Sequence, residues 1–172
     1  MLDVCIPCRL DDRTATAARH VARAVVLVVT LAGLTSCSIT GPSARRSDEL
    51  ELARNRQRWA SARVHDYEFD FQRTCFCPPE LTQEVHIVVR DDAIVSVVRT
   101  SDGQPAYGDY TIWPSIDALF LDVQQRLEQH IERLDVTYDE TLGYPRSILA
   151  DIALMAADDE YALTAGSLRR LP

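Results

Sequence analysis

The stretch from Tyr67 to Pro79 constrains the fold most strongly, because it reads Y-E-F-D-F-Q-R-T-C-F-C-P-P. Aromatic side chains alternate with charged or polar ones, which is the pattern of a β-strand buried on one face. Side chains alternate along a strand, so one face carries Tyr67, Phe69, Phe71, Arg73, Cys75 and Cys77. The two prolines then end the strand, since proline has no backbone N–H to donate to a neighbour. We therefore expect a core strand whose end holds two nearby thiols.

The composition fits one acidic globular domain. The chain has 172 residues, of which 47% are hydrophobic, and its formal net charge is −8. A protein that binds nucleic acid needs a basic patch to neutralise phosphates, and this sequence has no basic stripe. We therefore expect no nucleic-acid partner.

The N-terminus resembles a bacterial export signal. Arg19 and Arg23 precede an apolar run at residues 24–34, and a positive flank before a short apolar core is typical of a secretory signal peptide. The run is too short to span a bilayer, which takes about 20 residues. The sequence L-T-S-C, ending at Cys37, resembles the lipobox, in which the cysteine is diacylated before cleavage. An ordinary signal peptide with an incidental cysteine is the alternative.

The lipobox predicts how the chain is processed and where it resides. Residues 1–36 would be removed, and Cys37 would carry enough lipid for stable anchoring, so the membrane is an expected partner. Ser38 is not the aspartate that retains enteric-type lipoproteins at the inner membrane. This favours a periplasm-facing position at the outer membrane in a diderm host. Residues 37–47 are predicted to form a flexible tether, and residues 48–172 a single α+β domain.

Two segments are predicted to be helices. Ser47 is a suitable N-cap for a helix that runs to about Arg63. Ser115 caps a second helix, whose apolar residues repeat at intervals of three and four as far as Leu134.

The remaining patterned segments are predicted to be strands. Asp91 and Asp92 form a tight hairpin turn between two of them. The strands after the first are expected at residues 84–90, 93–99, 135–139, 146–152 and 160–167. The order is a helix and three strands, then the same again. We predict an α+β fold, in which an antiparallel sheet of about six strands has both helices packed on one face.

Cys75 and Cys77 are the strongest candidates for chemistry. In an oxidising compartment an even pair on one strand face favours a disulfide. A redox-active pair, and free thiols or metal ligands, are the alternatives. The C-x-C spacing is not the C-x-x-C of thioredoxin-like proteins, and no helix is predicted to follow the pair.

Other catalytic or metal-binding patterns are missing from the sequence. His65, His86 and His130 stand alone, without the i, i+4 spacing of a zinc helix. There is no G-x-S-x-G motif and no glycine-rich phosphate loop. We therefore expect no metal, no cofactor and no enzymatic activity.

Three aromatic residues in the long loop at residues 100–114 are the other candidates for binding. Tyr107, Tyr110 and Trp113 could form an aromatic rim that recognises a partner. Alternatively, these side chains cover the end of the sheet.

Several positions together resemble a bacterial family. They are Trp59, Tyr67-x-Phe69, Cys75-Phe-Cys-Pro78, a valine-rich hairpin, Leu119-Phe120, Val136-Thr-Tyr-Asp139 and Gly143-Tyr-Pro145. This set is similar to a domain of unknown function, DUF6174, and the C-F-C-P segment is its most specific part. The resemblance covers nearly all of the mature domain. It implies a secreted protein or lipoprotein and no particular activity. Asp92-Ala93 departs from the family, which more often has glycine in this hairpin.

Two functional hypotheses follow from the sequence. The first is a membrane-anchored lipoprotein that acts as a non-enzymatic binding or structural module for an envelope protein. The second is a thiol–disulfide or copper-handling accessory protein that uses Cys75 and Cys77.

Overall fold

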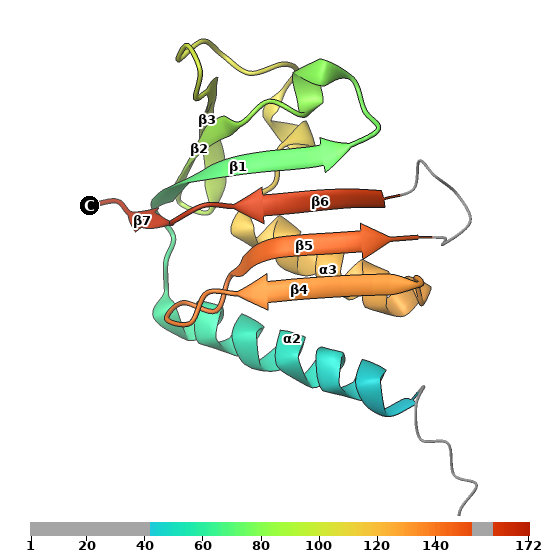
Figure 1. Ribbon diagram of the computed structural model, residues 1–172. Coiled ribbons are helices and arrows are strands. Elements are labelled where there is room, and N and C mark those ends of the chain that lie inside the picture. The colour runs from blue at the N-terminus through green and yellow to red at the C-terminus, as the bar shows by residue number, and fades with distance from the viewer. Residues whose placement is uncertain (1–41, 153–159) are drawn as a thin grey trace, which may run out of the picture. The chain divides into compact units, whose positions relative to one another are not determined.

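The computed structural model describes residues 42–152 and 160–172. Within these ranges a seven-stranded antiparallel sheet and two α-helices confirm the predicted α+β fold (Figure 1). The helices are α2 (Pro42–Ala62) and α3 (Ile116–Gln129), with short 3-10 helices η1 (Pro79–Leu81) and η2 (Tyr110–Ile112). The strands are β1 (Tyr67–Cys75), β2 (Val85–Arg90), β3 (Ala93–Arg99), β4 (Arg133–Tyr138), β5 (Pro145–Asp151), β6 (Glu160–Ala165) and β7 (Arg169–Arg170). The predicted signal peptide and the predicted lipidation site, Cys37, lie outside the described residues.

The sheet consists of two three-stranded meanders joined through its central pair. Its strand order is β3-β2-β1-β6-β5-β4, and the short β7 pairs with the start of β1 (Figure 1). The predicted order of a helix and three strands, repeated once, is confirmed, with β7 added at the end. β1 therefore lies in the middle of the sheet, which explains why its sequence carries the strongest strand pattern.

One face of the sheet, which we call the inner face, carries the core. Tyr67, Phe69 and Phe71 of β1 point to it, and each is at most 1% exposed. Both helices contribute buried side chains to the same core, as predicted. The Tyr67 hydroxyl accepts a hydrogen bond from the Ile116 backbone N–H at 3.2 Å, which fixes the start of α3 against β1. Burial raises the pKa of Tyr67 to about 12.

The hairpin between β2 and β3 turns at Asp91 and Asp92, as predicted. Their φ angles are 47° and 62°. Two central residues with positive φ define the turn whose twist matches that of the flanking strands. Aspartate tolerates this conformation better than most residues other than glycine, so the hairpin forms without the glycine that the family more often has.

The backbone between β6 and β7 is held by a local set of hydrogen bonds. The Gly166 N–H donates to the Asp70 carbonyl at 2.7 Å, which continues the pairing with β1. The buried Tyr144 hydroxyl donates to the Gly166 carbonyl at 2.9 Å and accepts from the Leu168 N–H at 3.2 Å. A single side chain thus provides hydrogen-bond partners for one backbone carbonyl and one backbone N–H at the point where the strand is interrupted.

The predicted start of the first helix and the predicted end of the second were wrong, whereas the end near Arg63 and the cap at Ser115 are confirmed. α2 begins at Pro42, so residues 42–47, which we assigned to the tether, are helical. Proline suits the first turn of a helix, since its φ is already helical and its missing N–H would have no partner there. α3 has the predicted cap at Ser115 but ends at Gln129, because His130 adopts the left-handed conformation. Leu134 therefore belongs to β4.

Candidate functional site

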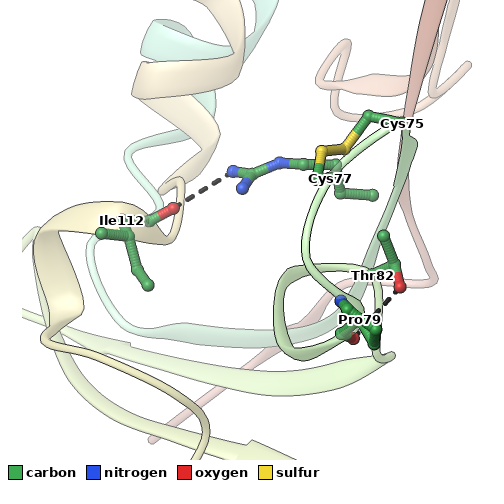
Figure 2. Close-up of a disulfide and its surroundings, with 6 residues drawn as sticks. Cys75, Cys77, Pro79, Thr82 and Ile112 are labelled. Atoms are coloured by element: carbon green, nitrogen blue, oxygen red, sulfur yellow. Dashed lines mark hydrogen bonds between the residues drawn. A yellow bond between two sulfur atoms is a disulfide. The ribbon is translucent and has the colours of Figure 1, made fainter.

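The end of β1 carries the predicted cysteine pair. β1 pairs with β2 only as far as Phe71, but it pairs with β6 as far as Cys75. Cys77 lies beyond the strand, which corrects the prediction that both cysteines belong to it. The two residues form a close pair, drawn as a disulfide in Figure 2, with their Cα atoms 5.2 Å apart. The pair closes a very short loop at the point where β1 loses its β2 neighbour.

Phe76 occupies the tip of this loop and is 85% exposed. The chain continues into η1, where the Leu81 N–H donates to the Pro78 carbonyl at 2.9 Å. The Thr82 hydroxyl donates to the Pro79 carbonyl at 3.1 Å (Figure 2). Phe76 is therefore a large apolar side chain presented to solvent from a short, internally bonded turn.

Arg73 ties the loop at residues 100–114 to the same end of β1. Its guanidinium donates to the Ile112 carbonyl at 3.1 Å (Figure 2) and lies 5.9 Å from the centre of the Phe71 ring. The side chain is half-buried, and this burial lowers the pKa of Arg73. Tyr110, which belongs to η2 together with Ile112, is thereby held at this end of the sheet.

The aromatic rim is only partly exposed. Tyr107 and Tyr110 are 61% and 47% exposed, whereas Trp113 is 4% exposed. The Trp113 ring packs edge-on against Phe71, with 6.4 Å between ring centres, and its Nε1 donates to the Tyr107 carbonyl at 3.1 Å. Trp113 therefore covers the end of the sheet, which was the alternative interpretation, and it is not part of a recognition surface.

A polar cluster that sequence reasoning missed lies on the inner face beside Cys75. Tyr161 of β6 is the direct partner of Cys75 across the sheet. Its hydroxyl donates to Asp122 Oδ2 at 2.6 Å and accepts from Arg126 Nε at 2.7 Å. Burial and the hydrogen bond to Asp122 raise the pKa of Tyr161 well above its usual value. In the sequence, Asp122 and Arg126 look like an ordinary i, i+4 pair on a helix surface.

Comparison with known proteins identifies the family of the chain. A model of the family described as "Family of unknown function (DUF6174)" matches residues 51–170. The chain belongs to this family. No curated protein and no solved structure matched the chain. The matched range covers the cysteine pair, Phe76 and the polar cluster of this DUF6174 domain.

Two histidines of the DUF6174 domain each lie beside a carboxylate. His86 Nδ1 lies 2.7 Å from Asp70 Oδ1 on the face of the sheet opposite the inner face. His65 Nδ1 lies 2.8 Å from Asp92 Oδ2. Within residues 42–152 and 160–172, no group of three or more candidate ligands could hold a metal ion. In the same part of the chain, no helix is long and apolar enough to cross a membrane.

Proposed function

We propose that the protein is a lipoprotein of the bacterial cell envelope, anchored through Cys37, whose domain binds an envelope protein without catalysing a reaction. The lipobox supports the anchor, and a diderm host would place the domain in the periplasm at the outer membrane. Cleavage before Cys37 and lipid on this residue would leave the folded domain close to the membrane surface.

The exposure of Phe76 carries the binding proposal. A side chain of this size that is 85% exposed is costly in water, since burial of a phenylalanine is worth about 1.5–3 kcal/mol. Aromatic residues dominate the binding energy of protein interfaces. The close pair of Cys75 and Cys77 restricts the loop before binding, so little conformational entropy is lost on association. The exposed Tyr110, held at the same end by Arg73, would extend the contact.

Site-specific photo-crosslinking in cells tests the binding proposal. A photoreactive residue at position 76 or 110 of the full chain should give the same crosslinked envelope protein. The control position is Leu121, which is 48% exposed on α3. Crosslinking at 121 should not yield this product. The proposal fails if positions 76 and 121 give the same products, or if Phe76→Ser leaves the crosslink from position 110 unchanged.

Fatty-acid labelling tests the anchor. Labelled fatty acid should be incorporated into the wild-type protein and not into Cys37→Ala. Ser38→Ala is a matched control, because it changes the neighbouring residue but keeps the thiol, and it should remain labelled. Label that persists in Cys37→Ala would contradict lipidation.

Thiol–disulfide exchange is a second candidate, because the polar cluster adjoins the cysteine pair. Arg73 shares the strand face of Cys75, and Arg126 binds Tyr161, the partner of Cys75 in the sheet. Nearby positive charge stabilises a thiolate and thereby favours the reduced pair. A reduction potential below about −300 mV would mark an inert structural bridge. In the redox case the potential should lie above this value and should fall in Arg73→Gln.

A further inference from the structure

A groove runs between α2 and the edge strand β4, at a different place from Phe76. It consists of three adjoining hollows of about 330, 40 and 270 Å³, which we call together the α2–β4 groove. Neighbouring hollows share lining residues, so the groove is continuous from Arg45 to Arg58 along α2. The apolar side chains at its floor are Val123, Leu127, Leu134, Val136 and Tyr138.

Among the described residues, the β4 side of this groove carries an unpaired strand edge. In the described part of the chain β4 pairs only with β5, so its other edge is unpaired, and α2 runs beside β4 (Figure 1). Such an edge presents backbone N–H and C=O groups that can pair with another strand. The inner-face residues of β4, Leu134 and Val136, are only half-buried. An added strand would complete both the hydrogen bonding and the burial.

The middle of the groove is acidic. Asp48 and Glu51, both exposed, line the central hollow over the apolar floor. Their negative charges add to the effect of burial in raising the pKa of Tyr138, so both carboxylates act on the floor of the groove. Among the residues that the structure describes, neither carboxylate takes part in an ion pair. A positive charge with an apolar stem would complement this region.

We propose that the α2–β4 groove binds an extended segment of another protein, which adds to β4 as a strand and places a lysine or arginine beside Asp48 and Glu51. Strand addition supplies affinity through the backbone, and alternate side chains that point into the groove supply specificity. The aliphatic stem of the basic side chain lies on the floor while its charged group meets the carboxylates.

The charge pattern favours such a segment over a second copy of this chain. If two copies paired through β4, the inner-face side chains that entered each groove would be Leu134, Val136 and Tyr138. None of these is cationic, so the paired strand would bring no new positive charge to the two carboxylates. A foreign strand with a basic residue supplies this charge.

The test uses the mature lipidated chain in phosphatidylcholine nanodiscs and a nine-residue probe, S-T-V-T-R-T-V-T-S. Its arginine and valines share one face when the peptide is extended. Titration calorimetry gives the affinity, and hydrogen exchange locates binding at the β4 amides. We expect the probe to slow exchange at β4, and we expect its lysine version to bind similarly. Versions with alanine or glutamate in place of the arginine should bind about tenfold more weakly or not at all.

Two variants distinguish this site from non-specific attraction. Asp48→Asn combined with Glu51→Gln should weaken the arginine probe about tenfold and remove its preference over the glutamate probe. Glu49→Gln, an exposed position of α2 that does not line the groove, should leave the affinity unchanged. A probe with N-methylated amides on one edge should lose binding, because it cannot pair with β4.

The following results would overturn the proposal. Equal affinity for the arginine and glutamate probes would rule out the acidic site, and unchanged exchange at β4 would rule out strand addition. Protection of β4 that appears without probe and rises with protein concentration would assign the groove to a second copy of the chain.

Discussion

The inner face of the sheet is well covered under β1 and β2, which we call the covered end, and poorly covered at the edge strand β4, which we call the open end. Under β1 and β2, the side chains of Phe69, Phe71, Val85, Ile87 and Val89 are at most 1% exposed. Under β4, Leu134, Val136 and Tyr138 are only half-buried, although they have the same alternating pattern. Alternation shows which side chains point inward, but coverage depends on what packs above them. The covered end is therefore core, and the open end is a surface that can still bury area.

The position of α2 explains the difference. Trp59 packs edge-on against Tyr67 and Tyr144, with ring centres 5.5 and 6.3 Å apart, so the C-terminal half of the helix is fixed. Close contact at Gly143 fixes it further, because a Cβ there would lie 2.6 Å from the Asn55 carbonyl oxygen. Asp48 and Glu51 precede this contact region and leave the groove beside β4 open. The helix is thus fixed at one end and stands beside a gap at the other.

The largest predicted effect comes from truncating the covered end. Phe69→Ala should lower the free energy of unfolding by about 3–5 kcal/mol, because it leaves a cavity in a fully packed core. Leu134→Ala should cost about 1–2 kcal/mol, since that side chain is only partly buried and less transfer free energy is lost. Chemical denaturation of both variants measures the comparison. Equal losses would show that β4 is covered as well as β1.

The sequence predicted the covered end much better than the open one. The Y-E-F-D-F pattern places Tyr67, Phe69 and Phe71 on one face of a strand, and three aromatic side chains on one face predict that this face is buried. Strand β1 and its buried face therefore followed from periodicity alone. The groove could not be predicted in this way, because it depends on where α2 is fixed. The position of α2 depends on the close contact between Gly143 and Asn55, and neither residue belongs to a sequence pattern that predicts this contact.

Only part of the candidate site could be predicted from the sequence. Cys75 and Cys77 are recognisable by residue type, but the exposure of Phe76 between them was not predicted, because it depends on the end of β1 having, among the described residues, no neighbour that covers this side chain. The contact of Tyr161 with Asp122 and Arg126 joins residues on β6 and α3 that are far apart in the sequence. Such a contact depends on the strand order, which the sequence did not determine.

Alkaline pH should destabilise the covered end. Tyr67 has an ordinary pKa of 10.0 and a pKa of about 12 when folded, chiefly because it is buried. The unfolded chain therefore loses this proton first, so the stabilisation is complete below pH 10 and is lost as the pH rises to about 12. The expected loss is roughly 2–3 kcal/mol, since each pKa unit is worth about 1.4 kcal/mol. Denaturation at several pH values measures it, and Tyr67→Phe should make the alkaline loss smaller by this amount, while the contribution of Tyr138 and Tyr161, whose pKa values are also raised, remains. Tyr107→Phe, at an exposed position, is the control and should leave the alkaline loss unchanged.

A smaller effect is expected where α2 meets the sheet. Tyr144→Phe removes the hydroxyl that bridges Gly166 and Leu168, while its ring still contacts Trp59. We expect a loss of about 1–2 kcal/mol, because a carbonyl and an N–H at the break between β6 and β7 lose their partner. Hydrogen exchange should show faster opening of the Leu168 amide. Unchanged exchange there would mean that water replaces the hydroxyl without cost.

The smallest effect on stability should come from the acids of the groove, and it separates binding from folding. Asp48→Asn with Glu51→Gln should change the free energy of unfolding by less than about 0.5 kcal/mol, because both side chains are exposed. The same variant should lower the pKa of Tyr138, since both carboxylates help to raise it. Tyrosinate absorbance during a titration measures this change. A large loss of stability would show that these acids hold α2 in place. A lower Tyr138 pKa with unchanged stability would mean that the open end of the sheet keeps its negative charge for a purpose other than folding.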